Sequence, residues 1–222
     1  MSGGATRLIR LSLPGPAGPL EALWQEREGL DPPIVAVVCH PHPLYGGTLN
    51  NKVVHRAAAA LHALGAAVLR FNFRGAGQSA GRHDEGRGEL EDARAALRCA
   101  SERFPRARRW LAGFSFGSWI AARLAAGESG IEQLILIAPP VRTSSFSVLR
   151  ECATPKLVIQ GTADDVCAPE WLEAEYPRWS EPKRLVRVEG AGHFFDRHLA
   201  ALGAAITDSL LAAAGGGRQW AA

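Results

Sequence analysis

The sequence predicts an α/β protein whose doubly wound, mostly parallel sheet has about eight strands, with an antiparallel pair at its N-terminal edge. Three observations predict this fold class. Short apolar runs alternate along the chain with Ala-rich helical stretches, which is the pattern of βαβ units. The run Ile34 to Cys39 is apolar throughout, as in a strand that is buried on both faces. Before it, residues 6–13 and 20–27 form two strand-like segments around a turn rich in proline and glycine.

The other elements follow from the same alternation of patterns. The expected helices are Asn51 to Leu64, Glu89 to Phe104, Ile120 to Ala126 and Leu199 to Ala213. The expected later strands are Ala66 to Phe73, Trp110 to Phe114, Ile131 to Ala138, Lys156 to Gln160 and Arg184 to Val188. We therefore expect a single domain over residues 1–214 and a flexible tail over residues 215–222.

The composition excludes several classes of protein. With 222 residues, 47% hydrophobic and 21% charged, the chain has enough material for one full core, and its net charge of +3 is small. The densest basic cluster is Arg106, Arg108 and Arg109, and it has no aromatic stacking platform, so we expect no nucleic-acid partner. No apolar run reaches the roughly 20 residues that a membrane span needs, so we expect no membrane partner.

The cysteines and the N-terminal residues favour a cytoplasmic location. Residues 1–7 contain no apolar core of signal-peptide length. The four cysteines are scattered without a C-x-x-C pair, as expected for reduced thiols, and they are Cys39, Cys99, Cys152 and Cys167. We expect a monomer or a small homo-oligomer.

The pentapeptide Gly113-Phe114-Ser115-Phe116-Gly117 is the most informative motif in the chain. It lies between a predicted strand and a predicted helix, so the chain turns sharply with Ser115 at the apex. Side chains at Gly113 and Gly117 would collide in so tight a turn. The geometry exposes the Ser115 hydroxyl above the N-terminus of the next helix. The motif therefore predicts a nucleophile elbow.

Two later strands end next to residues that can activate such a serine. Asp164 and Asp165 follow the strand Lys156 to Gln160, and His193 follows the strand Arg184 to Val188. Since the carboxyl ends of parallel strands share one edge of a sheet, Ser115, an acid and His193 should meet there. A serine hydroxyl needs a base to take its proton, and the base needs an acid to orient it. We expect a catalytic triad of Ser115, His193 and Asp164, with Asp165 as the competing acid.

The elbow and the order Ser, Asp, His resemble the α/β-hydrolase superfamily from about Leu20 to about Leu211. Residues 39–54, CHPHPLYGGTLNNKVV, resemble more narrowly a group of small, lidless bacterial α/β-hydrolases related to dienelactone hydrolase. Residues 70–79, RFNFRGAGQS, are similar to the segment after the fourth strand in the wider superfamily. The resemblance implies a serine hydrolase, and the superfamily pattern G-x-x-D counted from Gly161 favours Asp164 over Asp165.

Two departures limit what the resemblance implies. Dienelactone hydrolase is known for a cysteine nucleophile, whereas this chain has Ser115, so its lactone specificity does not carry over. Many lipases insert a lid between the sixth strand and the acid. Here that connection, residues 139–154, has room for one short helix and no cap domain, so we expect an open site.

An acyl-transfer site also needs backbone N–H groups that stabilise the negative oxygen. Phe116 should supply one. The second should come from the loop after Cys39, where prolines have no N–H to donate. Among residues 41–45, those that keep an N–H are His42, Leu44 and Tyr45. The resemblance implies a donor two residues after a histidine that ends the strand, which fits His42 or Leu44 equally.

The substrate pocket and the other histidines are less constrained by the sequence. Tyr45, Phe146 and Phe194 are the expected substrate-binding side chains, although each could equally be ordinary core or cover. His40 and His42 form an H-x-H pair that either shapes the loop or binds a metal. No neighbouring acidic pattern supports a metal, so we expect no metal and no cofactor.

These features predict an enzyme that cleaves carboxylic esters of small to medium substrates through an acyl-enzyme intermediate. The same triad would serve a thioesterase or a peptidase/amidase, because fold does not decide between these reactions. The alternative from another class is a non-catalytic binding protein on this fold.

Overall fold

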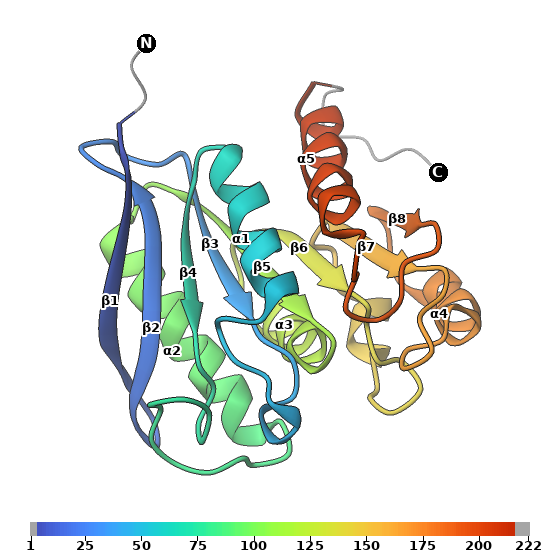
Figure 1. Cartoon of the computed structure of the whole chain (residues 1–222), viewed down its shortest axis with the longest axis horizontal. Helices are drawn as coiled ribbons and strands as arrows, with labels where there is room; N and C mark the ends of the chain where they lie inside the picture. Colours follow the sequence, from blue (N-terminus) through green and yellow to red (C-terminus); the bar gives the residue numbers. More distant parts are fainter. Residues whose placement is uncertain (1–3, 216–222) are drawn as a thin grey trace.

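The sheet is built from eight strands in the order β1-β2-β4-β3-β5-β6-β7-β8, in a computed structural model that describes residues 4–215 (Figure 1). The strands are β1 (Thr6–Gly15), β2 (Gly18–Arg27), β3 (Ile34–Cys39), β4 (Ala66–Phe71), β5 (Arg108–Phe114), β6 (Ile131–Ile137), β7 (Lys156–Gly161) and β8 (Lys183–Val188). The helices are α1 (Lys52–Ala63), α2 (Arg87–Arg103), α3 (Phe116–Gly127), α4 (Pro169–Glu175) and α5 (Leu199–Gly215). Short 3-10 turns are η1 (Pro43–Tyr45), η2 (Ser147–Arg150) and η3 (Tyr176–Arg178).

The predicted antiparallel edge is confirmed. β1 pairs antiparallel with β2, with Leu13 opposite Leu20, and β2 pairs antiparallel with β4. From β4 onward every pairing is parallel. The fold is therefore the expected mostly parallel α/β-hydrolase sheet.

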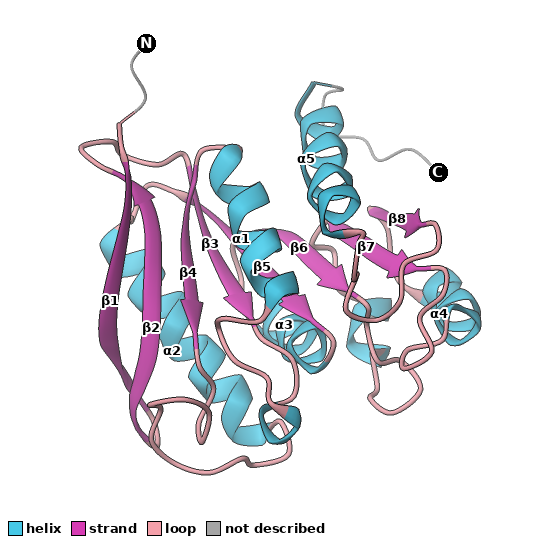
Figure 2. Cartoon of the chain, viewed as in Figure 1, coloured by secondary structure: helices cyan, strands magenta, loops and turns pink. Residues whose placement is uncertain are grey.

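Helices cover both faces of the sheet, which explains why every residue of the central strands β3 and β4 is buried (Figure 2). On one face α1 and α5 contribute Val53, Leu61 and Ile206 to a buried core. On the other face α2 and α3 contribute Leu97 and Ile120 to a second core. The two cores hold the strands in place, so the loops that follow them are supported from both sides.

Some boundaries differ from the predicted ones for local reasons. β4 ends at Phe71: the Asn72 N–H still donates to the carbonyl of Glu21 in β2, but the next amide, that of Phe73, donates to the His40 side chain instead. The sequence patterns did not predict the short helix α4. The expected tail lies outside the described residues except for Gly215, where α5 ends.

The connection between β6 and β7 contains η2 and no cap domain, as predicted from its length. The edge of the sheet formed by the carboxyl ends of its parallel strands is therefore left open. Among residues 4–215, no helix is both long enough and apolar enough to cross a membrane.

Candidate active site

Ser115 occupies a strained turn between β5 and α3. Its backbone has φ 51° and ψ −122°, a conformation that costs a non-glycine residue about 1–3 kcal/mol. A Cβ at Gly113 would collide with the backbone of Gly117, and a Cβ at Gly117 would collide with the carbonyls of Cys39 and His40. Both glycines are therefore required by close backbone approach, as the motif predicts. The turn holds the Ser115 hydroxyl in a half-buried position above the start of α3.

The structure brings Ser115, His193 and Asp164 together from three loops. Nε2 of His193 lies 3.1 Å from Oγ of Ser115, and Nδ1 of His193 lies 2.9 Å from Oδ2 of Asp164. Because an ionised carboxylate can only accept, Nδ1 carries the proton and Nε2 is left to accept from the serine. His193 and Asp164 are almost fully buried, at 5% and 3% exposure. The arrangement has the connectivity that lets an imidazole take a serine proton.

Four hydrogen bonds hold the Asp164 carboxylate. Oδ1 accepts from the backbone N–H groups of Val166 and Cys167, at 3.0 and 2.7 Å. Oδ2 accepts from His193 and also from Nε2 of Gln160, at 3.0 Å. The neighbouring Asp165 is exposed and makes none of these contacts. Gln160 was not singled out from the sequence, although a polar residue at the end of the buried strand β7 was an available signal.

His40 shapes the loop after β3. Its side chain is fully buried, its Nδ1–H donates to the carbonyl of Pro41 at 2.6 Å, and its Nε2 accepts from the N–H of Phe73 at 2.9 Å. Burial lowers the pKa of His40 to about 4, while the hydrogen bond to Pro41 opposes the shift. Both ring nitrogens are thus used to join the β3 and β4 loops, which leaves neither nitrogen to bind a ligand.

The backbone N–H groups near Ser115 are not equivalent. The N–H of Leu44 donates to Nδ1 of His42 at 3.3 Å, and the N–H of Tyr45 donates to the carbonyl of His42 at 3.1 Å. Within residues 4–215, the N–H groups of His42 and Phe116 have no hydrogen-bond partner. The His42 and Phe116 rings lie 4.8 Å apart, so the two free donors belong to neighbouring segments.

The His42 imidazole is suited to accept from Leu44. Partial burial and the nearby His83 lower its pKa, and Glu89 partly opposes this shift. A neutral ring can leave Nδ1 unprotonated, as the contact with the Leu44 N–H requires.

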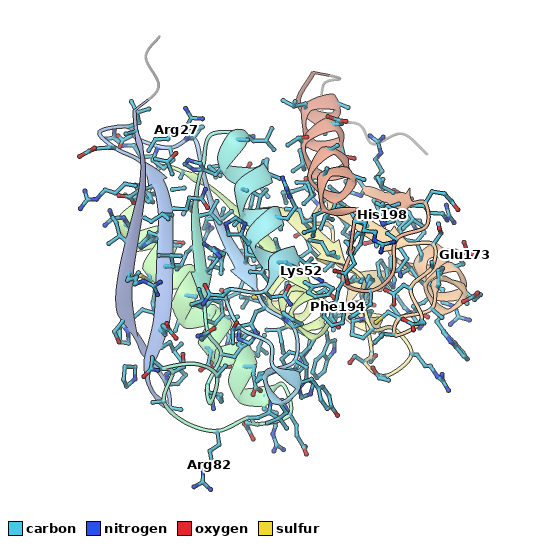
Figure 3. All side chains as sticks on the ribbon, in the orientation of Figure 1. Arg27, Lys52, Arg82, Glu173, Phe194 and His198 are labelled. Carbon is cyan, nitrogen blue, oxygen red and sulfur yellow. The ribbon has the colours of Figure 1, made fainter. Side chains whose placement is uncertain are left out.

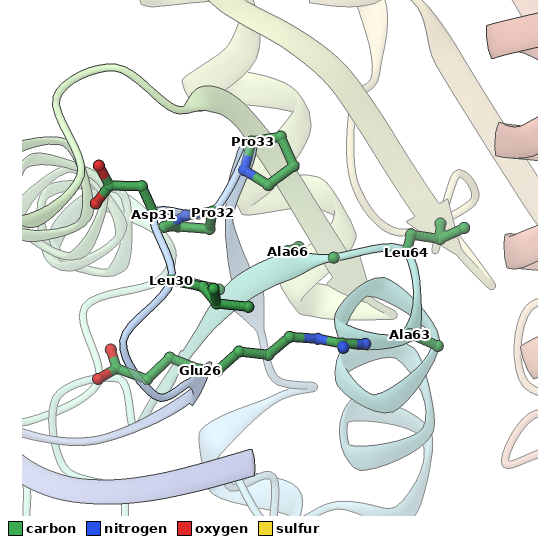
Figure 4. A pocket seen from close by; sticks show the side chains of 11 residues that line it. Glu26, Leu30, Asp31, Pro32, Pro33, Ala63, Leu64 and Ala66 are labelled. Carbon is green, nitrogen blue, oxygen red and sulfur yellow. The ribbon is translucent and has the colours of Figure 1, made fainter. Parts of the chain in front are cut away.

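A cavity of about 250 Å³ opens beside the serine. Tyr45, Ser115, Phe116, Cys167 and Trp171 are among its lining residues. Another cavity, of about 340 Å³, lies at the other end of the sheet, between the loop after β2 and the turn from α1 into β4, and no serine, threonine or cysteine lines it (Figure 4). The chemistry therefore points to the cavity beside Ser115.

Of the three expected substrate-binding side chains, the cavity brings only Tyr45 to the serine. Phe146 does not line the cavity, since it is 2% exposed and stacks on Trp179 in the core, with ring centroids 5.6 Å apart. Phe194 is 43% exposed and packs edge-on against His193. Lys52 lies over the Phe194 ring at 5.6 Å, and Figure 3 shows the two side chains close together. Phe194 thus covers the histidine from outside the cavity.

Cys167 is a neighbour of the site that the motifs did not reveal. It lines the cavity beside Ser115, and burial, reinforced by Asp164, raises the pKa of its thiol to about 12, while Ser115 opposes the shift. Donor atoms of Asp164, Cys167 and His193 lie within 4.8 Å of one another, the spacing of a possible metal site. The Asp164 oxygens and Nδ1 of His193 are already engaged with each other and with Gln160 and backbone amides, so binding a metal there would require breaking those bonds.

Known proteins share this fold and much of this sequence. Residues 44–150 match the family described as serine aminopeptidase, S33. The chain is 38% identical over 206 residues to an uncharacterized protein of Rickettsia prowazekii. The matched region covers 89% of this chain and 86% of that relative.

Two solved structures are similar along nearly the whole chain. An alpha-beta serine hydrolase homologue from Coxiella burnetii is 42% identical with a TM-score of 0.87, covering 91% of this chain and 97% of that chain. An α/β serine hydrolase without a lid from Xanthomonas campestris is 39% identical with a TM-score of 0.86, covering 93% of this chain and 95% of that chain. The chain belongs to the lidless α/β serine hydrolases of the α/β-hydrolase superfamily.

Proposed function

We propose that this serine hydrolase cleaves carboxylic esters of small to medium substrates, with Ser115, His193 and Asp164 as its catalytic triad. One observation carries the proposal: the two nitrogens of His193 lie within hydrogen-bond distance of the Ser115 hydroxyl and of the Asp164 carboxylate at the same time. A small water-soluble ester is the expected partner, and a cytoplasmic location remains part of the proposal.

Each step of the reaction is defined by the group that holds the proton of the Ser115 hydroxyl. Ser115 Oγ attacks the ester carbonyl carbon while Nε2 of His193 takes the hydroxyl proton, and the Asp164 carboxylate stabilises the resulting imidazolium. The imidazolium then gives this proton to the departing alcohol, which leaves an acyl group on Ser115. Water, deprotonated by the same nitrogen, attacks the acyl carbon and releases the acid. His193 then returns the proton to Ser115.

The negative oxygen formed in each attack needs two aligned donors. We assign them to the backbone N–H groups of Phe116 and His42, because both are free of other partners in the described residues. Leu44, the other candidate, already donates to the His42 ring. The N–H of Leu44 is therefore already used in a hydrogen bond to the His42 side chain.

The cavity supports a small substrate. Its volume of about 250 Å³ is below the roughly 300 Å³ at which pockets for drug-sized ligands begin. Tyr45 is 86% exposed at its edge, where it can contact the substrate without closing the site.

A peptidase is the second candidate, because the matched family is described as a serine aminopeptidase. An aminopeptidase must hold the ammonium group of a peptide N-terminus, which favours a carboxylate in the pocket. None of the described residues that line the cavity is acidic. This difference favours an ester over a peptide.

The test is covalent labelling combined with kinetics. A fluorophosphonate probe should label the native protein at Ser115, and Ser115→Ala should lose both labelling and about 10⁶-fold in kcat on a p-nitrophenyl ester. Ser129→Ala is the matched control, since it removes an exposed hydroxyl from the turn between α3 and β6. Matched ester, thioester and anilide substrates separate the three reactions. Near-normal turnover in Ser115→Ala would refute the mechanism, and absence of labelling and turnover in the native protein would favour a binding protein.

A further inference from the structure

The loop after β6 forms one wall of the cavity beside Ser115, and the charged side chain of the cavity lies on this wall. This loop supplies Val141, Arg142, Thr143 and Ser144 to the lining. Three backbone hydrogen bonds fix its turn: the Val141 N–H donates to the carbonyl of Pro139 at 2.9 Å, and the N–H groups of Thr143 and Ser144 donate to the carbonyl of Pro140 at 3.1 and 3.0 Å. The position of Arg142 is thus set by an ordered backbone.

Arg142 is exposed, lies over an aromatic ring and has no ionic partner. The centre of its guanidinium lies 5.1 Å from the ring centroid of Trp171, which comes from α4 on another side of the cavity. Within residues 4–215, no carboxylate lies within salt-bridge distance of Arg142. Other exposed arginines, such as Arg150 and Arg187, are paired with glutamates. The stacked Arg142 therefore keeps its hydrogen-bonding edge free.

The surroundings do not neutralise this charge from within the cavity. Arg142 is the one lining residue of the described chain with a permanent charge, and no lining residue is acidic. Asp164 is close to the site, but its oxygens are already engaged with His193, Gln160 and backbone amides. The exposed Asp165 precedes α4 and the exposed Glu170 lies in its first turn, next to Trp171, yet neither lines the cavity.

A guanidinium that lies over an aromatic face is well suited to bind a carboxylate. Its planar fork matches the two carboxylate oxygens, and stacking on an aromatic face orders the fork before a ligand arrives. Less side-chain entropy is then lost when the ligand binds. The same cavity holds the nucleophile, so an anionic group at Arg142 and a scissile ester at Ser115 can belong to one small molecule.

We infer that the enzyme prefers esters that carry a carboxylate away from the scissile bond, and that Arg142, ordered by Trp171, binds that carboxylate. The class includes monoesters of dicarboxylic acids and esters whose alcohol bears the acid. The inference rests on the proposed esterase function and adds the charge of its substrate.

The experiment compares two matched pairs of substrates. The acyl-side pair is the p-nitrophenyl monoester of adipic acid against p-nitrophenyl hexanoate, and the alcohol-side pair is m-carboxyphenyl butyrate against m-carbamoylphenyl butyrate. The measured quantity is the ratio of kcat/KM for the anionic to the neutral ester, after background hydrolysis with Ser115→Ala is subtracted. Comparing this ratio between variants cancels the intrinsic reactivity of each ester.

Arg142→Ala should lower the ratio about tenfold in at least one pair, and Arg142→Glu should lower it further because the new carboxylate repels the substrate. Arg142→Lys keeps the charge without the planar fork, so its ratio should fall between those of the wild type and Arg142→Ala. In the wild type, added salt should reduce the ratio through screening. Arg106→Ala, which removes an exposed arginine just before β5, is the control for net charge and should leave the ratio unchanged.

The two possible failures are distinguishable. If the wild type hydrolyses the neutral esters but Arg142→Ala and Arg142→Glu keep the wild-type ratio in both pairs, the inference about Arg142 is overturned and the esterase function stands. If no ester in either pair is hydrolysed and Ser115 is not labelled, the esterase function itself fails, and the inference fails with it.

Discussion

At the scale of single residues, the neighbouring acids Asp164 and Asp165 are similar candidates in the sequence, and their hydrogen bonds distinguish their roles. Asp164→Asn should reduce kcat by about 10⁴-fold, because an amide in its place favours the wrong tautomer of His193. Asp165→Asn removes the charge of an exposed side chain and should leave kcat close to the wild-type value. Steady-state kinetics of the two variants on one ester measure the difference. The opposite ranking would mean that Asp165 orients the base.

His40 gives a residue-scale prediction about stability and pH. Its pKa is lowered from 6.5 to about 4 in the folded protein, so the unfolded chain binds its proton first as the pH falls. The contribution of His40 is complete above about pH 6.5 and is lost progressively down to about pH 4, by about 3 kcal/mol in total. Urea unfolding across this range should show a smaller pH dependence for His40→Gln than for the wild type. Equal slopes would contradict the buried, neutral ring.

At the scale of elements, one buried ion pair joins α2 to the loop after β4. The guanidinium of Arg74 donates to both oxygens of Asp92, at 2.9 and 2.7 Å, and the Asp92 side chain is fully buried. The hydrogen bond to Asp92 raises the pKa of Arg74. Asp92→Ala would leave the largely buried Arg74 without its partner and should reduce the free energy of unfolding by about 3–5 kcal/mol.

Glu173→Ala is the matched comparison for Asp92→Ala. It removes a carboxylate from a surface pair with Arg187, where both side chains are about half exposed. Exposed pairs add little stability, so its effect on urea unfolding should be much smaller. Similar losses in the two variants would show that the buried pair has no special role.

Most elements could be predicted because their signals are local. The continuous apolar run of β3, the Ala-rich helices and the glycines of the elbow all have the pattern of the structure they form. The short helix α4 was missed, since seven residues carry too little periodicity to distinguish a helix from a loop. The end of β4 depends on His40, a partner distant in sequence, which no local pattern reports.

At the scale of the whole molecule, topology predicts where functional residues meet but not how their side chains pack. Parallel strands bring Ser115, Asp164 and His193 to one edge, so their proximity could be predicted from the order of elements. The sequence did not distinguish Phe146 in the core from a pocket residue, because its stacking partner Trp179 lies in a different segment. The contact of Arg142 with Trp171 likewise joins separate segments.

The second oxyanion donor could not be chosen from the sequence either, although its two candidates are only two residues apart. His42 and Leu44 fit the sequence pattern equally, and they differ in the structure because the His42 ring accepts from the Leu44 N–H. A side-chain orientation of this kind follows from packing against Tyr45, His83 and Phe116.

The connection between β6 and β7, which has no cap domain, has a consequence for how the protein encounters its substrate. Among the described residues no flap has to be displaced, so Ser115 needs no oil–water boundary to become reachable by dissolved molecules. Because no described element closes over a bound molecule, discrimination among substrates must then come from the fixed walls of the cavity beside Ser115.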